Sequence, residues 1–242
     1  MDKAYVHLQW DSDFFGFNVA RITRLDIGDE CLTSILQELR TNNYRLVYWY
    51  VPSEYSAIAS MAEKHGGVLV DNKVTYAKQI TNTIPTSLSH SFGVTPYLLE
   101  EPGPALINLA LESGMYSRFR LDPSFPTELF EKLYACWITR AVRKEIAWEV
   151  LVVKDAGEIL GVVTLGGKEK RGAIGLMAVA SKSRGMGIGT ILVEASERCF
   201  ADHGYTAVQI VTQRANVAAC SLYKSCEYRI ENIDNIFHFW LQ

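Results

Sequence analysis

Short apolar runs and helical patterns alternate through the first eighty residues. Leu32, Ile35, Leu36 and Leu39 recur three and four positions apart, which predicts a helix over residues 31–43. The aromatic and β-branched run 45–51 predicts a buried strand that is stopped by Pro52. Further expected elements are strands at 4–10 and 18–25, a helix at 56–67, and either one long strand at 68–80 or a hairpin around Asp71 and Asn72.

A polar segment rich in Ser, Thr, Pro and Gly follows at residues 81–95 and is the best linker candidate. We therefore expect a small α/β N-terminal domain at 1–88 and a second domain at 89–242. The second domain opens with two helical patterns, at about 102–114 and 126–144. The stretch between them is expected to be a loop that carries Arg118 and Arg120.

The remainder of the chain turns to strands, in the predicted order β-β-β-α-β-α-β. A helix end followed by strands occurs at 63–76 and again at 223–236, which suggests that the first domain is a truncated relative of the second. The expected elements are strands at 148–155, 158–167 and 172–180, a helix that follows residues 184–189, a strand at 206–212, a helix at 216–226, and one or two strands at 228–242.

Composition excludes several classes of protein. The formal net charge of −3 over 242 residues gives no bulk signal for nucleic-acid binding. No apolar run approaches the roughly 18 residues needed to cross a bilayer, and the N-terminus lacks a signal-peptide pattern, so no membrane partner and a cytoplasmic location are expected. The five cysteines form no C-x-x-C pair, and the histidines lack metal-ligand spacing, so neither disulfides nor a metal is expected.

The segment "SRGMGIGT" at 183–190 carries the clearest chemical signal. Unpaired backbone N–H groups at a helix N-terminus bind anions, and glycines let a phosphate approach them. A P-loop is excluded because Thr190 and Ile191 follow Gly189 where Lys and Ser or Thr are needed. A dinucleotide site is disfavoured because the third glycine comes one residue early and no acid ends the next strand. An acyl-CoA pyrophosphate site fits the order of elements.

Arg184, Gly187 and Gly189, between a strand and a helix, resemble motif A of the GCN5-related N-acetyltransferase (GNAT) superfamily over roughly residues 100–242. The resemblance implies an α/β GNAT fold, with a mixed, mostly antiparallel central sheet, splayed at the acetyl-CoA site and flanked by helices. It also implies acetyl-CoA as cosubstrate. The implied acetyl-CoA-binding residues are Met177, Ala178, Val179, Arg184, Gly185, Met186, Gly187, Ile188, Gly189, Thr190, Asn216 and Tyr223.

Tyr223 is the expected catalytic residue. Asn216 can cap the helix that follows it, and Tyr223 lies seven residues later on nearly the same face. A tyrosine hydroxyl near the thioester sulfur can protonate the departing thiolate. Family members often place a Gly-Phe pair after this tyrosine, whereas this chain has Glu227 and Tyr228, which puts the local helix end in doubt.

Two stretches suggest the acceptor. "WDSDFFGFNVARI" at 10–22 and "SGMYSRFRLDP" at 113–123 resemble family members that acetylate the 4-amino group of TDP-linked 4-amino-4,6-dideoxy sugars for surface polysaccharide synthesis. The resemblance implies a nucleotide-sugar substrate, whose phosphates match guanidinium groups well. The implied contacts are Tyr116, Arg118, Phe119, Arg120, Asp13 and Phe15, although the N-terminal phenylalanines also fit a role as anchors between the domains.

Several alternatives stay open at this point. The general base is not visible, because nothing in the spacing favours Glu149, Glu169 or His238. The acceptor can instead be a protein N-terminus, a lysine or a polyamine, and the fold can also serve a non-catalytic acetyl-CoA sensor. A homodimer is expected only because relatives often pair.

Overall fold

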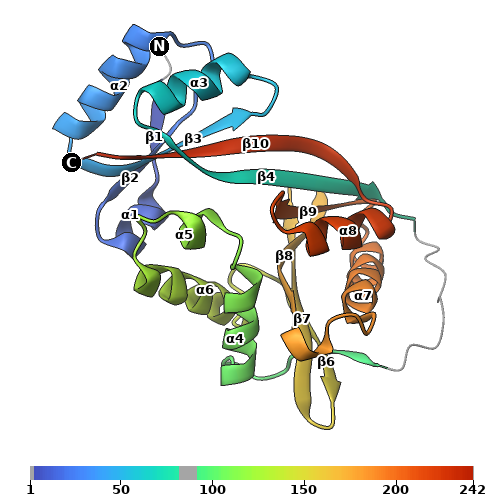
Figure 1. The fold of residues 1–242 in the computed structure, drawn as a ribbon. Helices are drawn as coiled ribbons and strands as arrows, with labels where there is room; N and C mark the ends of the chain where they lie inside the picture. The colour runs from blue at the N-terminus through green and yellow to red at the C-terminus, as the bar shows by residue number, and fades with distance from the viewer. Residues whose placement is uncertain (1–2, 82–91, 242) are drawn as a thin grey trace.

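The computed structural model describes residues 3–81 and 92–241, which form one ten-stranded sheet flanked by helices (Figure 1). The expected linker falls mostly outside the described residues. The strands are β1 (Tyr5–His7), β2 (Asn18–Ile22), β3 (Tyr44–Pro52), β4 (Val68–Gln79), β5 (Val94–Pro96), β6 (Glu149–Asp155), β7 (Glu158–Lys168), β8 (Arg171–Val179), β9 (Ala207–Gln213) and β10 (Arg229–Trp240). The helices are α1 (Gln9–Phe15), α2 (Asp29–Thr41), α3 (Ser56–Lys64), α4 (Pro104–Ser113), α5 (Arg118–Leu121), α6 (Thr127–Val142), α7 (Ile188–Asp202) and α8 (Val217–Ser225), with a 3₁₀ turn η1 (Ser181–Ser183).

The order of strands across the sheet is β1-β2-β3-β10-β4-β9-β8-β7-β6-β5. The pairs β2–β3 and β8–β9 are parallel and the other pairs between described strands are antiparallel, so the sheet is mixed and mostly antiparallel. The last strand, β10, lies between β3 and β4 of the first eighty residues (Figure 1). The division at residue 88 stays a prediction, but the two parts of the chain share one continuous sheet.

Alternating residues of β10 enter two different cores. Phe237 and Phe239 pack with α2 and α3 on one face of the sheet. His238 and Trp240 lie on the other face, where Trp240 packs in a core built from α1, α5 and α6. This alternation is the two-residue period of a strand that is covered on both faces. The strands β6–β8 are likewise covered on both faces. Helices α4 and α6 pack against one face, and α7 packs against the other.

Most of the elements expected from the sequence are present, with shifts of a few residues at their ends. The expected strand at 4–10 is wrong beyond His7, because the chain turns into α1 at Gln9. The segment 68–80 forms the single long strand β4, not a hairpin. The expected loop around Arg118 contains the short helix α5, and the strand β5 was not expected.

The sheet splays beside the expected acetyl-CoA site, as the GNAT resemblance predicts. Strand β8 pairs with β9 only from Gly172 to Ile174, and from Gly175 onward it keeps only its partner β7. At this point the β7–β8 register shifts, and the Thr164 hydroxyl accepts a hydrogen bond from the Leu176 amide at 2.8 Å. The parted strands leave backbone groups of residues 176–179 free to face a ligand.

Within the described chain, no helix is long and apolar enough to cross a membrane.

Candidate active site

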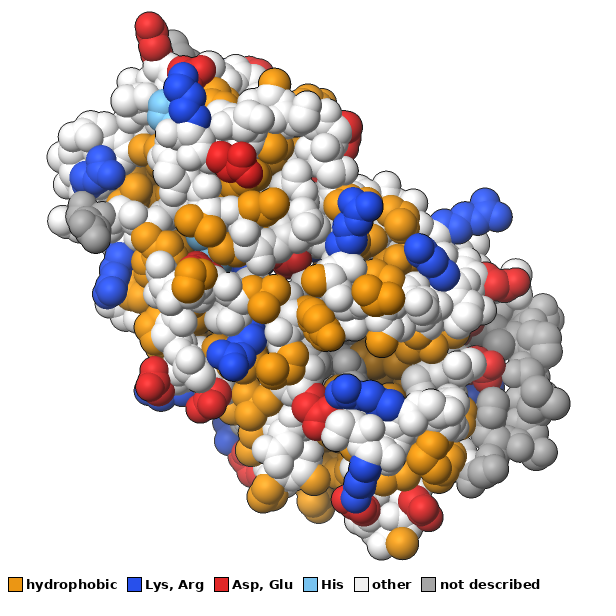
Figure 2. Space-filling model, in the orientation of Figure 1, with side chains coloured by type: hydrophobic (Ala, Val, Ile, Leu, Met, Phe, Trp, Pro, Cys, Tyr) orange, Lys and Arg blue, Asp and Glu red, His pale blue; other side chains and the backbone are white. Residues whose placement is uncertain are grey.

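A cavity of about 380 Å³ opens where β8 and β9 part. The end of β8, the turn before α7 and the helix α8 form its walls. Figure 2 shows the recess from outside, with apolar side chains inside it and charged side chains at its rim. Most of the expected acetyl-CoA-binding residues line it together: Met177, Ala178, Val179, Arg184, Gly185, Gly187, Ile188, Gly189, Thr190, Asn216 and Tyr223. Met186 projects from the turn, is exposed, and does not line this cavity.

The glycine turn is shaped for a ligand at the start of α7. Gly187 is the residue that precedes the helix, and its φ of +78° is a left-handed conformation that side chains disfavour. A Cβ on Gly189 would lie 2.9 Å from a methyl of Leu222, so a glycine here lets α8 approach α7 closely. The first-turn amides of α7 have no partner within the helix and carry its partial positive charge, so this end can bind an anionic group such as a pyrophosphate.

Arg184 spans the mouth of the cavity. Its Nη2 donates to Glu112 Oε2 of α4 at 2.8 Å, and its Nε donates to the carbonyl of Val179 at 3.2 Å. Both side chains of this ion pair are partly exposed, so the pair contributes little to stability. A guanidinium in this position can exchange its carboxylate partner for a phosphate group.

Tyr223 lies deep in the cavity, and its side chain is 5% exposed. Its hydroxyl donates to the sulfur of Met177 at 3.9 Å, and its ring packs edge-on against Tyr76. Burial raises the pKa of Tyr223 above its ordinary value, so the phenol keeps its proton at neutral pH. The hydroxyl is therefore a proton donor. Asn216 Oδ1 accepts from the Ala219 amide at 3.2 Å and caps α8, which fixes the helix that carries Tyr223.

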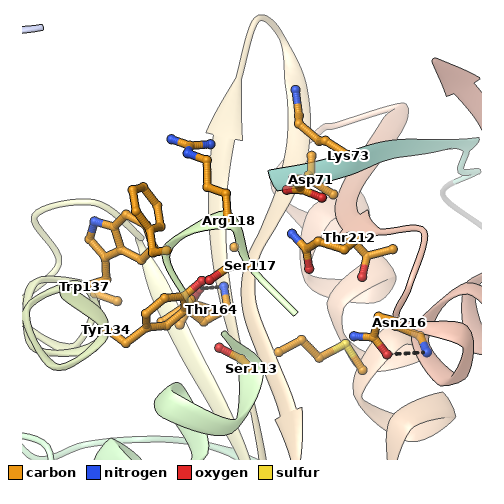
Figure 3. Close-up of a pocket in the computed structure, with 18 of the residues that line it drawn as sticks. Asp71, Lys73, Ser113, Ser117, Arg118, Tyr134, Trp137, Thr164, Thr212 and Asn216 are labelled. Carbon is orange, nitrogen blue, oxygen red and sulfur yellow. Dashed lines mark hydrogen bonds between the residues drawn. The ribbon is translucent and has the colours of Figure 1, made fainter. Parts of the chain in front are cut away.

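A second cavity, of about 440 Å³, joins the first. Both are lined by Ser113, Met177, Asn216, Ala219 and Tyr223. Figure 3 shows Tyr134 and Trp137 of α6 on one side and Lys73, Asp71, Thr212 and Asn216 on the other, with Arg118 between the two groups. The two cavities meet at Tyr223, so a donor in one and an acceptor in the other can react at that residue.

Arg118 and Asp71 supply opposite charges to the second cavity. The Arg118 guanidinium lies over the rings of Tyr48 and Phe119, at 4.7 and 4.4 Å, and its Nε is buried without a hydrogen-bond partner among the described residues. Asp71 is 7% exposed, and its Oδ1 is also buried without a partner there. Burial raises the pKa of Asp71 to about 7, although the cations Arg118 and Lys73 oppose the shift. Such a carboxyl can exchange a proton near neutral pH.

The remaining expected substrate contacts are dispersed. Phe119 lines the second cavity and Tyr116 lines the first. Arg120 is exposed and lies over the ring of Phe130. Asp13 is exposed and accepts from Gln9, while Phe15 is buried against Phe17, Phe119 and Phe125. The structure brings Arg120, Asp13 and Phe15 into neither cavity, and Phe15 instead anchors α1 to α5.

None of the three expected base candidates lines either cavity. Glu149 accepts from Lys144, Glu169 lies in the exposed β7–β8 turn, and His238 is buried and hydrogen-bonded to Asp122.

Asp71 was not predicted as a site residue from the sequence, because the pair Asp71-Asn72 resembles a turn. The available signal was its place inside a strand pattern, where an unpaired acid is costly and therefore suggests a function.

Among the described residues, no group of three or more His, Cys, Asp or Glu side chains is arranged to hold a metal ion.

Comparison with known proteins gives consistent similarities. Residues 115–228 match the model of the acetyltransferase (GNAT) family. The chain is 29% identical over 227 residues to a dTDP-fucosamine acetyltransferase of Escherichia coli O6:H1, covering 93% of each chain.

Solved structures resemble this one in fold. A GCN5-related N-acetyltransferase from Sphaerobacter thermophilus is 16% identical with a TM-score of 0.65, covering 98% of this chain and 76% of that chain. A functionally unknown conserved protein from Staphylococcus epidermidis is 11% identical with a TM-score of 0.68, covering 93% and 85%. A tandem GNAT protein from the clavulanic acid biosynthesis pathway is 11% identical with a TM-score of 0.58, covering 93% and 71%.

Proposed function

Because the chain is a GNAT-family acetyltransferase, we propose that it transfers an acetyl group to the amine of a nucleotide-linked amino sugar. The family implies acetyl-CoA as the donor. The acceptor we propose is a TDP-linked 4-amino-4,6-dideoxyhexose, and the product is its 4-acetamido derivative. The relative from Escherichia coli is named for dTDP-fucosamine, and the similarity covers 93% of the chain rather than the GNAT segment alone.

The observation that carries the proposal is the junction of the two cavities at Tyr223. The first cavity offers the N-terminus of α7 and Arg184 to a pyrophosphate. Its inner end reaches the Tyr223 hydroxyl, where the thioester would lie. The second cavity offers the acceptor a route to the same hydroxyl from the opposite side.

The charges of the second cavity favour an anionic acceptor. Arg118 and Lys73 line it together with one carboxylate, Asp71, so cations outnumber anions at its wall. The aromatic rings of Tyr134 and Trp137 give apolar faces on which a sugar or a base can pack. A groove for a lysine or a polyamine would need an excess of carboxylates, because those acceptors are cationic.

The reaction divides between two side chains in this proposal. The amine nitrogen attacks the thioester carbonyl, so a C–N bond forms and the C–S bond breaks. Asp71 takes the proton that the ammonium group must lose before it attacks, and Tyr223 gives its hydroxyl proton to the departing sulfur. The second proton, which the new amide nitrogen loses, returns to the Tyr223 oxygen. Met177, whose sulfur is 3.9 Å from that hydroxyl, holds the tyrosine beside the reacting centre.

The first test measures release of the CoA thiol from acetyl-CoA with four acceptors. These are TDP-4-amino-4,6-dideoxygalactose, its gluco epimer, spermidine and a lysine peptide. We expect turnover with a TDP-sugar only, and a preference between the epimers would reveal the geometry at C4. Activity confined to spermidine or the peptide would contradict the sugar proposal while leaving the acetyltransferase intact.

A second test addresses catalysis itself. Removing the hydroxyl in Tyr223→Phe should lower kcat by roughly 10²- to 10⁴-fold, because a general acid is lost. The affinity for acetyl-CoA, measured by calorimetry, should stay within about twofold, since only one oxygen atom is removed. Tyr228→Phe is the matched control, because Tyr228 is a buried tyrosine of the same core that lines neither cavity. Unchanged turnover in Tyr223→Phe would assign the acid elsewhere, and acetyl-CoA binding with no turnover of any acceptor would favour a sensor.

A further inference from the structure

A buried carboxylate joins α5 to the last strand of the sheet. Asp122 directly follows α5 and is 3% exposed. Its Oδ2 accepts from His238 Nδ1 at 2.6 Å and from Trp240 Nε1 at 2.8 Å, and its Oδ1 accepts from the Ser124 amide at 2.9 Å. His238 and Trp240 are two residues apart on β10, so they present their donors on the same face. Both oxygens of the carboxylate are therefore engaged.

The same group of side chains leads to the acceptor cavity. The His238 ring packs against the Tyr48 ring at 4.8 Å, and both residues are fully buried. Arg118 is a second neighbour of Tyr48, and its guanidinium lies 4.7 Å from the ring centre. The main chain also links the two residues, because the Asp122 amide donates to the Arg118 carbonyl at 3.1 Å at the end of α5. The Arg118 side chain therefore contacts Tyr48, and its main chain is bonded to that of Asp122.

Ionisation within this group is fixed by burial and by hydrogen bonds. Burial lowers the pKa of His238 to about 4, so its ring is neutral at pH 7 and donates through Nδ1. Burial favours the neutral acid at Asp122, but the bonds from His238 and Trp240 outweigh it and hold the pKa of Asp122 below its ordinary value. The contact is therefore a hydrogen bond from a neutral imidazole to a carboxylate.

We propose that Asp122 is a positioning residue for the acceptor, which acts by fixing α5 to β10 so that Arg118 points into the second cavity. Asp122 lines neither cavity, so it does not touch the substrate itself. The inference rests on the proposed function only in that the second cavity receives the acceptor. It assigns a role to β10, which joins the two parts of the sheet, in binding the substrate.

The test is Asp122→Asn, which keeps the shape of the side chain. An amide places an NH₂ group against either the Ser124 amide or the two donors of β10, so at least one buried donor loses its acceptor. We expect the KM for TDP-4-amino-4,6-dideoxygalactose to rise about tenfold, with the KM for acetyl-CoA unchanged and kcat within about threefold. Trp240→Phe removes one donor of three and should raise the acceptor KM less, which gives a milder variant if Asp122→Asn does not fold.

Two further variants separate positioning from general destabilisation. Glu197→Gln is the matched control, since Glu197 is a buried carboxylate that accepts from Lys78 and lines neither cavity. It should lower the melting temperature without changing the acceptor KM. Arg118→Lys should raise the acceptor KM, and adding Asp122→Asn to it should change that KM little further, because Asp122 acts through Arg118.

The outcomes are distinguishable. An Arg118→Lys variant with an unchanged acceptor KM would contradict the proposed acceptor cavity itself. A raised KM in Arg118→Lys with none in Asp122→Asn and Trp240→Phe, or additive effects in the double variant, would overturn the positioning role alone. Equal rises of both KM values would also overturn it, because a purely structural defect does not select the acceptor.

Discussion

Burial acts in the same way on Tyr223 and Asp71, the two side chains to which we assign opposite proton-transfer roles. Each is nearly buried, and burial raises the pKa of both because it disfavours their charged forms. For the phenol, the shift keeps a proton available for donation. For the carboxyl, the shift brings the pKa to about 7, where it can accept a proton. One physical effect thus suits the two side chains, both in the second cavity, to the proposed roles of acid and base.

At Asp71 we predict opposite effects of one substitution on activity and stability. In the wild type, kcat/KM should fall as the pH drops below about 7, when Asp71 becomes protonated. Asp71→Asn should lower kcat by roughly 10²-fold or more and should abolish this pH dependence. Rate profiles from pH 5.5 to 9 would measure both changes, and an unaltered acid limb in the variant would place the base elsewhere.

The stability effect of Asp71→Asn follows from the sign of the pKa shift. The native carboxyl binds its proton more tightly than the unfolded chain does, so its contribution to stability is fully present below the ordinary pKa of 3.8 and is lost as the pH rises to about 7. Asp71→Asn removes that loss, so its melting temperature should exceed that of the wild type at pH 8, and the difference should shrink as the pH falls toward 4. Asp155→Asn, at an exposed position at the end of β6, should change neither quantity.

Among the elements, α8 shows how a helix end fixes Tyr223, the proton donor that we propose. The Tyr228 amide donates to the Tyr223 carbonyl at 2.9 Å, and the Glu227 amide donates to the Lys224 carbonyl at 3.0 Å. These two bonds form a Schellman motif, and the rings of Tyr223 and Tyr228 lie 6.3 Å apart across it. The motif requires a left-handed residue, and Glu227 adopts a φ of +67°. The helix end that the sequence left in doubt therefore forms, at the expense of some strain.

Glu227→Gly should relieve that strain. A non-glycine residue in the left-handed region costs about 1 kcal/mol, and the added freedom of glycine in the unfolded chain offsets part of the gain. The Glu227 side chain is 85% exposed and 4.0 Å from Lys78, so its loss matters little. We expect a rise in melting temperature of about 1–3 °C with unchanged turnover, measured by calorimetry and the thiol assay. Glu227→Ala, which keeps a Cβ, should give no such rise.

On the scale of the whole molecule, β10 joins two parts of the chain in one sheet. It pairs with β3 from Leu46 to Pro52 and with β4 from Val68 to Ala77, so the last strand completes the sheet of the first eighty residues. Strand β4 in turn pairs with β9. Neither part of the chain can satisfy the backbone hydrogen bonds of its strands alone.

We therefore predict a single unfolding transition. Denaturation in urea, followed by tryptophan fluorescence and by far-UV circular dichroism, should give coincident curves, because Trp49, Trp137 and Trp240 pack near one part of the sheet and Trp148 near the other. Residues 1–88 expressed alone should remain unfolded, since β3 and β4 would lack the strand that lies between them. Two separated transitions, or a folded 1–88 fragment, would show that the domains are independent.

The sequence by itself determined the features that depend on neighbours along the chain. The spacing of apolar residues predicts most of the helices and strands, and the glycines at 185, 187 and 189 predict the turn and helix start that line the first cavity. Asn216 and Tyr223 are placed on one face of α8 by helical periodicity alone. Such features are local, because dihedral preferences and the periods of helix and strand involve only residues a few positions apart.

Only the tertiary structure decided which distant residues meet. It inserts β10 between β3 and β4, brings Asp71 to Arg118, and joins Asp122 to His238 across 116 positions of sequence. It also separates Arg120, Asp13 and Phe15 from the cavities they were expected to line. Pairings of this kind depend on strand order and on which buried polar groups find partners, and no local spacing records either of these. The residues that line the first cavity were therefore largely predictable from the sequence, whereas most of those that line the second were not.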